Sequence, residues 1–468
     1  MSRQLLRNSF SGLSGMTLQK IAHLATMIVL ARMLGAEQFG IYAFVGAVMF
    51  FLGFLSDLGM ERVLTRELAA RPHDAPVLLG TALWLRLGLG LVAASVSFVL
   101  GWAFRWDRTT FVCLSLAAAA LPFGFDLLAR AYFQSRLQVR TYYAISVLGS
   151  VSFLILVLCC WRWKPSVTAV FIVGLANALL FALIFLLAVR SYVRISPVLV
   201  VEHARLLLRE ASQVGLLALL FMTALRIDQI FLFHLRGAQD VGEYAAAVRL
   251  TEALGMFSEA MMLSLFPLLA ASHRSNPRVF RHRYLTGFRY LAAAGVSLAL
   301  AISLIAPEAL RLIFGETYEA AWPAAVLLSW NMVLAFLGSV YVNVFLIHGW
   351  YRLLLVVSAV SVAVNIVLNL LWIPPYGGVG AAAATFISSL VGFALWFAFS
   401  ATRNIVVDCL RSSAPAVAAG ALAGAVGVFL LGWGGPAVAL SSLGLYGAML
   451  FWLGGIVKDD FRWVYSRS

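Results

Sequence analysis

The chain has 468 residues, of which 62% are hydrophobic and only 12% are charged. Soluble domains are nearer half apolar and a quarter charged, so this composition excludes a water-soluble globular protein and predicts that lipid surrounds the chain. The formal net charge is +14. The basic residues are spread over many loops, which favours contact with anionic lipid head groups and argues against a nucleic-acid partner.

Apolar runs of about 20 residues follow one another along the chain, and a helix of this length crosses about 30 Å of hydrocarbon. They predict an all-α integral membrane protein with about fourteen transmembrane helices. The expected helices lie near residues 11–33, 40–60, 78–104, 110–129, 141–161, 167–189, 211–235, 241–270, 288–307, 322–347, 353–373, 378–401, 413–432 and 436–457. The segment 403–412, before the last two, is expected to be a polar, partly amphipathic connection.

The distribution of Lys and Arg provides a test of this topology, because short cytoplasmic loops collect positive residues. With both termini in the cytoplasm, the cytoplasmic segments hold 23 of the 34 Lys and Arg residues, and the opposite side holds seven. Adding or removing one helix in the middle would scramble this alternation. We therefore expect an even number of helices and cytoplasmic termini. The first apolar run is not expected to be a signal peptide, because it is too long and contains Lys20.

Two short stretches repeat along the chain. LGAEQFGIY at 34–42 and RGAQDVGEY at 236–244 are offset by 202 residues, and four of their nine positions are identical. Both are expected on the outer side, six helices apart, which predicts a parallel repeat of two six-helix bundles. The alternative is that both stretches are only good turn sequences. The repeat divides the chain into an N-lobe at 1–210, a C-lobe at 211–402 and two appended helices with a cytoplasmic tail at 403–468.

Several motifs in these positions resemble one protein family. They are RMLGAEQFGIYAF (32–44), LSDLGMERVLTREL (55–68), RIDQIFLFHLRGAQDVGEYAAAVRL (226–250), IFGETYEAAWPAA (313–325) and NIVLNLLWIPPYGGVGAAAAT (365–385). They look like the bacterial polysaccharide flippases of the Wzx type, which carry O-antigen and exopolysaccharide precursors. That family belongs to the superfamily that also contains the MATE multidrug exporters and the lipid II flippase.

This resemblance implies a V-shaped pair of six-helix lobes with two appended helices. It also implies alternating access, in which a polyprenyl-pyrophosphate-linked oligosaccharide moves from the inner to the outer leaflet for cell-surface polysaccharide or lipopolysaccharide biosynthesis. The expected location is the bacterial cytoplasmic (inner) membrane, in multi-pass form. The expected partners are the lipid-linked oligosaccharide, membrane lipids and, as an open question, the polysaccharide polymerase and the chain-length machinery.

Enzyme chemistry has little support in the sequence. There is no nucleophile with a neighbouring base, no phosphate-cradling glycine loop and no group of residues with metal-ligand spacing. The four cysteines have no such spacing and are interpreted as small membrane hydrophobes. We therefore expect no catalytic residue, no metal and no cofactor, and we leave open a coupling cation, either H⁺ or Na⁺.

Charged side chains inside the apolar runs are the candidate site, because an ionised group at mid-bilayer costs at least about 2.5–3.5 kcal/mol and usually faces a cavity or a partner. Cations would hold the pyrophosphate, and acidic residues would form a polar network or couple an ion. The cations are Lys20, Arg86, Arg226 and Arg249, and the acidic residues are Asp228, Glu252 and Glu259. The alternative is a set of buried ion pairs that fixes helix packing, and Arg86 could also only reach toward the inner surface.

Arg249, Glu252, Met256 and Glu259 have helical spacing and should share one face. A second charged group lies at the inner end of the second expected helix. It contains Asp57, Arg62 and Arg66, which are candidates for a cytoplasmic gate, and surface charge pairing is the alternative. Asparagines such as Asn365 and Asn369 are interpreted as hydrogen-bond partners between helices rather than as sugar ligands.

Three functions remain open at this point. A flippase for a lipid-linked oligosaccharide requires cations in the cavity that match or outnumber the acidic residues. A cation or drug antiporter of the same fold would instead depend on acidic residues in the cavity, such as Glu252 and Glu259. A membrane polymerase or glycosyltransferase is expected to carry a large extramembrane loop with acid and base residues, whereas the longest loop, near 190–210, is basic.

Overall fold

The computed structural model describes residues 2–163, 165–430 and 435–455, and in this part of the chain the regular structure is helical with no strand. The predicted cytoplasmic tail beyond 455 lies outside the described residues. The helices are α1 (Ser2–Asp57), α2 (Met60–Ala70), α3 (Ala75–Ala103), α4 (Arg108–Ala118), α5 (Phe125–Ser135), α6 (Val139–Trp163), α7 (Val167–Arg190), α8 (Val201–Arg236), α9 (Ala238–Ser275), α10 (Pro277–Ile313), α11 (Trp322–Ile347), α12 (Tyr351–Leu395), α13 (Ser400–Leu430) and α14 (Gly435–Trp452).

Among the described residues, ten segments are long and apolar enough to cross a membrane, which confirms an all-α membrane protein with many spans. Two of these segments, Ser14–Ala70 and Tyr351–Leu395, each cover two expected helices. The helix α8 and the shorter apolar stretch Val438–Trp452 fall outside the ten. The exact number of fourteen crossings therefore stays a prediction.

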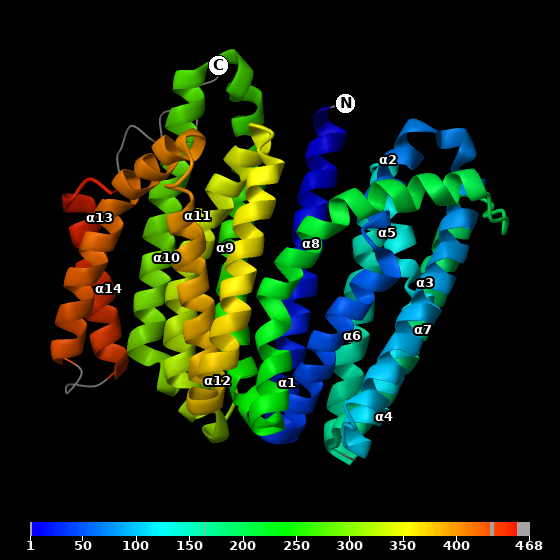
Figure 1. Cartoon of the computed structure of the whole chain (residues 1–468), viewed down its shortest axis with the longest axis horizontal. Coiled ribbons are helices and arrows are strands. Elements are labelled where there is room, and N and C mark those ends of the chain that lie inside the picture. The colour runs from blue at the N-terminus through cyan, green and yellow to red at the C-terminus, as the bar shows by residue number, and fades with distance from the viewer. Residues whose placement is uncertain (1, 164, 431–434, 456–468) are drawn as a thin grey trace. The chain divides into compact units, whose positions relative to one another are not determined.

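Glycines mark the bends inside the two long segments. Gly35 in α1 has φ 71° and ψ 173°, and Gly377 in α12 has φ 54° and ψ −133°. Because positive φ is strained for residues with a Cβ atom, glycine is the residue that permits the chain to turn back at these points. In Figure 1, α1 and α12 each run to one end of their bundle and turn back there.

The two repeated turns contact each other reciprocally. A Cβ atom on Gly40 would lie 1.7 Å from the carbonyl oxygen of Ala238, and a Cβ atom on Gly242 would lie 1.9 Å from the carbonyl oxygen of Ala36. Both contacts therefore require glycine. Gly40 and Gly242 are equivalent positions of the two stretches, and each contacts the equivalent alanine of the other stretch. This symmetry favours a structural repeat over two unrelated turns.

The chain divides by its internal contacts into two compact units. Unit 1 is Met1–Phe233 with Gly237–Gly242, and unit 2 is His234–Arg236 with Glu243–Ser468. These contacts assign α8 up to Phe233 to unit 1, whereas the sequence repeat assigns it to the second bundle. The predicted lobe boundaries at 210 and 402 describe the repeat and stay predictions.

The core of unit 1 lies where α2, α3, α5 and α8 meet, and it includes Leu64, Leu79, Phe133 and Leu207. One expected helix is interrupted here. The run 110–129 is predicted as continuous, but α4 ends at Ala118 and α5 begins at Phe125, with Pro122 between them. A Cβ atom on Gly90 of α3 would lie 2.5 Å from Pro122 Cα, so the interruption packs closely against α3.

The core of unit 2 is built on α10, which packs against α11, α13 and α14. Tyr446 of α14 donates to the carbonyl oxygen of Ala293 in α10 at 2.9 Å. The segment 403–412, expected as a connection, forms the first turns of α13 instead, and Asp408 and Cys409 are buried there. Asp408 contacts α10, and this tertiary partner stabilises a helix that the polar sequence alone does not indicate.

Candidate functional site

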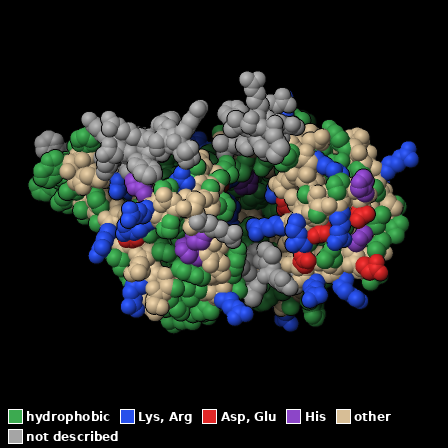
Figure 2. All heavy atoms as spheres, turned by 90° about the horizontal axis from the view of Figure 1, so that it is seen from above, with side chains coloured by type: hydrophobic (Ala, Val, Ile, Leu, Met, Phe, Trp, Pro, Cys, Tyr) green, Lys and Arg blue, Asp and Glu red, His purple; other side chains and the backbone are tan. Residues whose placement is uncertain are grey.

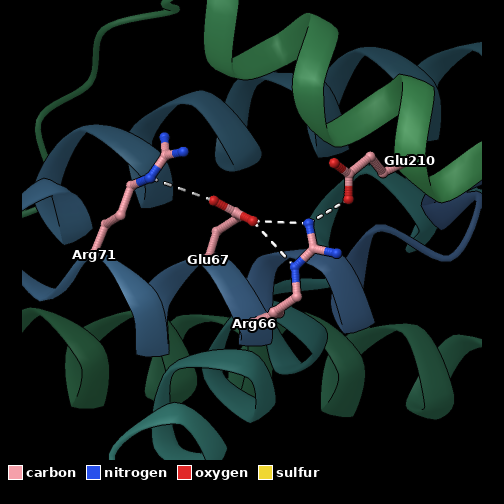
Figure 3. Close-up of polar contacts among 4 residues, drawn as sticks. All are labelled: Arg66, Glu67, Arg71 and Glu210. Carbon is pink, nitrogen blue, oxygen red and sulfur yellow. Dashed lines mark hydrogen bonds and ion pairs between the residues drawn. The ribbon is translucent and has the colours of Figure 1, made fainter.

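Unit 1 carries a network of charges at the end of α1 that leads into α2. Arg66 of α2 contacts Glu67 at 2.8 Å and also pairs with Glu210 of α8, while Arg71 lies 3.7 Å from Glu67 (Figure 3). The Arg66 side chain is 59% exposed, whereas Glu67 is only 8% exposed. The predicted gate residue Arg66 thus ties α2 to the first turns of α8.

The second predicted gate residue, Asp57, pairs with Arg86, which was predicted as a cargo-binding cation. Arg86 Nη1 of α3 donates to Asp57 Oδ1 at 3.4 Å, and the two side chains are 6% and 15% exposed. A Cβ atom on Gly124 would lie 2.2 Å from Arg86 Nη2, so the break between α4 and α5 leaves space for the guanidinium. Arg62, the third gate candidate, is exposed on α2.

A further pair extends this network toward α6. Arg130 Nε of α5 lies 3.5 Å from Glu61 Oε1 of α2 and donates to the hydroxyl of Tyr142 at 3.0 Å. The Arg130 guanidinium also lies 5.1 Å from the centre of the Tyr142 ring. Glu61, Arg130 and Tyr142 were not among the predicted site residues. Together these contacts hold α2, α5 and α6.

Two of the predicted cations lie on α1 and α8 of unit 1 and are half-buried. Lys20 lies on α1, and Arg226 of α8 places its guanidinium 5.6 Å from the centre of the Phe50 ring. Asp228, two residues after Arg226, is 5% exposed and accepts a hydrogen bond from the backbone of Gln229 at 2.7 Å. Asp228 and Arg226 therefore differ in burial, as expected for residues on different faces of one helix.

In unit 2, the charged stripe of α9 lies on one face, as its spacing predicts. Arg249 Nη1 donates to Glu252 Oε2 at 2.6 Å, and their side chains are 18% and 37% exposed. Glu259 is exposed further along the helix. The other face packs inward, where the Ser258 hydroxyl donates to the Ser339 hydroxyl of α11 at 2.9 Å. Arg249 is thus already paired with an acidic neighbour.

Sequence reasoning missed a charged clamp that attaches α13 to α10. Arg281 contacts both carboxylate oxygens of Asp408, with Nε at 2.9 Å and Nη2 at 2.6 Å, and the Tyr284 hydroxyl donates to Asp408 at 2.7 Å. Asp408 was expected in a polar, partly amphipathic connection, so no contact with α10 was predicted. An acidic residue that interrupts a short apolar run, as Asp408 does between Val407 and Cys409, is the signal that could have indicated it.

The asparagine interpretation is confirmed for two residues of α12. Asn369 donates to Asn365 at 3.0 Å, and Asn365 lies 3.5 Å from Thr385 and 3.4 Å from Ser388. These contacts join the two arms of α12 on either side of Gly377. Among the described residues, no group of three or more His, Cys, Asp or Glu side chains could hold a metal ion.

A sequence model described as "Polysaccharide biosynthesis protein" matches residues 5–273, which is more than half of the chain. The chain belongs to this family. No curated protein sequence matches the chain at a significant level.

Solved structures show that this polysaccharide biosynthesis protein shares the fold of known membrane transporters. The lipid II flippase MurJ in an inward closed conformation matches with a TM-score of 0.71 and 12% identity, over 98% of this chain and 100% of that one. An inward-facing multidrug resistance MATE transporter matches with a TM-score of 0.65 and 16% identity, over 84% and 96% of the two chains. A MOP superfamily transporter from Pyrococcus furiosus matches with a TM-score of 0.59 and 17% identity, over 87% and 96%.

The family and the helices make this chain a multi-pass membrane protein of the polysaccharide biosynthesis family, with a fold that it shares with a lipid II flippase and MATE transporters. Figure 2 shows Lys and Arg side chains interspersed with Asp and Glu side chains on the side of unit 1 seen from above. In this member of the family, the structure separates the predicted site residues into two sets. Arg86, Asp57 and Arg66 take part in ion pairs that join different helices, whereas Lys20, Arg226, Arg249, Glu252 and Glu259 lie at partly accessible or exposed positions on α1, α8 and α9.

Proposed function

We propose that the protein is a flippase that moves a polyprenyl-pyrophosphate-linked oligosaccharide from the inner to the outer leaflet by alternating access. The observation that carries the proposal is the partial exposure of two cations, Lys20 within a candidate membrane span and Arg226 on α8 beside the ring of Phe50. A cation directed into hydrocarbon is strongly disfavoured, so partly exposed cations at this depth indicate a water-filled path. Membership of the polysaccharide biosynthesis family and the likeness to a lipid II flippase support the choice of cargo.

The chemistry of the cargo fits these side chains. A pyrophosphate diester carries about two negative charges, arginine contacts phosphate oxygens with two parallel hydrogen bonds, and lysine supplies a compact charge. In this proposal Lys20 and Arg226 of unit 1 and, separately, Arg249 of unit 2 are cations that contact the pyrophosphate, while the glycan stays in water. Arg249 would then leave Glu252 when the cargo binds, because the Glu252 carboxylate and the pyrophosphate compete for the same guanidinium.

The membrane potential also favours outward movement of such a cargo. An inside-negative potential contributes about 2.3 kcal/mol per charge per 100 mV, so the export of two negative charges is downhill by roughly twice that amount. A coupling cation, bound by Asp228, Glu252 or Glu259, would reset the empty protein. We place the protein in the bacterial inner membrane with both termini in the cytoplasm, on the distribution of Lys and Arg.

The test is deletion of the gene followed by mass spectrometry of the extracted polyprenyl lipids. We expect a lipid-linked oligosaccharide to accumulate, and its mass identifies the cargo. Plasmids that encode Lys20→Ala or Arg226→Ala should fail to clear it, whereas Arg278→Ala, which removes an exposed cation at the start of α10, should clear it like the wild-type gene.

One observation favours a second function. Glu252 and Glu259 are exposed on a membrane helix and so also indicate a path for water or cations, as in a MATE-like cation or drug antiporter. In that case the polyprenyl lipids stay unchanged in the deletion strain while its sensitivity to cationic drugs rises. That result would contradict the flippase proposal and would make the two glutamates the residues to test.

A further inference from the structure

The turn between α3 and α4 holds a hollow that none of the proposed transport residues lines. Its volume is about 480 Å³, and it opens on the surface of unit 1. The residues that line it are Gly101, Trp102, Ala103, Arg105, Trp106 and Phe111. Because α3 is a membrane helix and the hollow lies at its end, the hollow is at the level of the lipid head groups.

The backbone of this turn is built to hold Arg105 in place. The chain leaves α3 through hydrogen bonds from Phe104 to Leu100 at 2.9 Å and from Trp106 to Gly101 at 3.3 Å. Arg105 between them has φ 50°, the left-handed conformation that usually falls to glycine or asparagine at a helix end. A residue with a long charged side chain at a strained position suggests that its side chain has a use there.

The charge of Arg105 is available to a ligand. Its side chain is exposed, and no ion pair with a carboxylate is found for it in the described part of the chain. The nearest acidic residue along the sequence is Asp107, whose carboxylate caps α4 by accepting a hydrogen bond from the backbone of Thr110 at 3.0 Å. Cations are also scarce on this side, which the sequence predicts to be the outer one.

The walls of the hollow are aromatic. Trp102 is 76% exposed, and Trp106 stacks on Phe104 at 5.8 Å and meets Phe44 edge-on at 5.1 Å. A Cβ atom on Gly101 would lie 2.5 Å from the ring of Phe111, so the floor of the hollow is closely packed. Rings of this kind favour the boundary between lipid and water, with the apolar part in lipid.

We propose that this hollow binds the phosphate of an anionic phospholipid, with Arg105 on the phosphate and Trp102 and Trp106 against the glycerol and the first methylenes. The polar side-chain groups of the lining residues are the guanidinium and the two indole N–H groups, which only donate hydrogen bonds. A lipid phosphate only accepts them, so the two sets match. A sugar ring carries hydroxyl donors and would need acceptor side chains, which this lining lacks.

An ordinary belt of interfacial aromatic residues is the simplest alternative. A belt accounts for exposed tryptophans. It does not account for a hollow between them or for an arginine held in a left-handed conformation at its edge. The phospholipid site accounts for both, and it is independent of the cargo that the protein moves.

The experiment compares Arg105→Asn with Arg108→Asn in the full-length protein, reconstituted in phosphatidylcholine nanodiscs with added phosphatidylglycerol. Asparagine tolerates the left-handed conformation, so the first variant removes the cation without adding strain. Arg108 is the matched control, because it is an exposed cation three residues away that does not line the hollow. Native mass spectrometry then counts the phosphatidylglycerol molecules that each protein retains.

We expect Arg105→Asn to weaken retention of phosphatidylglycerol roughly fivefold to tenfold, the size of one lost charge-assisted contact, while Arg108→Asn retains it like the wild type. Trp102→Ala should weaken retention as well, and Trp102→Phe should restore part of it. Equal retention by the wild type and Arg105→Asn would overturn the proposal. So would equal losses in both arginine variants, which would indicate surface charge alone, or a preference for added polyprenyl pyrophosphate over phosphatidylglycerol.

Discussion

The charge network of unit 1 and the charged stripe of α9 in unit 2 use the same residue types in opposite ways. In unit 1, Asp57 and Arg86 are nearly buried and come from different helices, so their contact holds elements together. In unit 2, Arg249 and Glu252 are neighbours on one helix and are more exposed, so their contact holds nothing beyond that helix. The difference separates a pair that joins two helices from a pair that lies on one helix, and it leads to the prediction that the accessible charges serve transport.

If this distinction is correct, loss of stability and loss of transport separate between the two regions. Substitutions in the network should lower the stability of the folded protein most, and substitutions in the stripe should lower transport with little effect on stability. The following tests run from the largest expected loss of stability to the smallest.

Arg86→Ala should have the largest effect, because it leaves Asp57 buried without its cation. The loss of a partner from a buried pair costs about 3–5 kcal/mol, which should appear as a clear drop in the thermal unfolding midpoint of the purified protein. Arg62→Ala on exposed α2 serves as the control and should leave the midpoint unchanged. Recovery of the midpoint in the double variant Asp57→Asn with Arg86→Met would show that the unpaired charge, and not lost packing, is the cause.

Asp408→Asn should have the next largest effect, because it removes the negative charge that accepts hydrogen bonds from Arg281 and Tyr284. Hydrogen bonds to a charged group contribute about 1.5–3 kcal/mol each, and the asparagine keeps part of that geometry, so we expect a loss of about 1–3 kcal/mol. Limited proteolysis with mass spectrometry should detect cleavage within α13 before cleavage elsewhere. Unfolding of the whole chain in a single step with an unchanged midpoint would contradict a local role for the clamp.

Arg249→Ala should change stability by less than about 1 kcal/mol, since the residue pairs only with Glu252 on its own helix. Transport should fall roughly tenfold or more, because a cation that contacts the cargo is lost. The measurement is the level of lipid-linked oligosaccharide in the deletion strain that carries each variant gene, beside the unfolding midpoint. Full transport by Arg249→Ala would remove Arg249 from the cargo site.

Arg66→Ala should have the smallest effect on stability, because this arginine is largely exposed and water screens its pairs with Glu67 and Glu210. If Arg66 belongs to a cytoplasmic gate, the rate of transport should still change, and the change should depend on salt concentration. Measurement at low and high ionic strength therefore separates a gate from a surface pair. A large fall in the unfolding midpoint would place Arg66 with the buried network instead.

Sequence reasoning predicted the class of protein, the bends and the charged face of α9, because each of these depends on a local pattern. Composition and length are sufficient to predict a membrane helix. The bends contain glycines, which adopt positive φ without strain. Helical spacing alone placed Glu252 and Glu259 on one face with Arg249. These features need no knowledge of tertiary neighbours.

The sequence did not predict which charges meet. Arg86 was grouped with the cargo cations and Asp57 with the gate, because spacing along a helix says nothing about a partner 29 residues away. Asp408 was placed in a polar, partly amphipathic connection, whereas it lies within α13 and contacts α10. The break at Pro122 was also missed, although proline in the middle of an apolar run disfavours a continuous helix.

The reciprocal contact of the two turns makes the chain resemble a fused dimer. In a two-fold dimer, residue i of one copy touches residue j of the other and the reverse also holds, as Gly40 with Ala238 and Gly242 with Ala36 do here. If one ancestral segment paired with a copy of itself, a single glycine in that segment would have allowed the close backbone contact in both turns. After fusion the two copies can diverge except at positions where each copy contacts the other. The two similar nine-residue stretches at 34–42 and 236–244 lie at these positions.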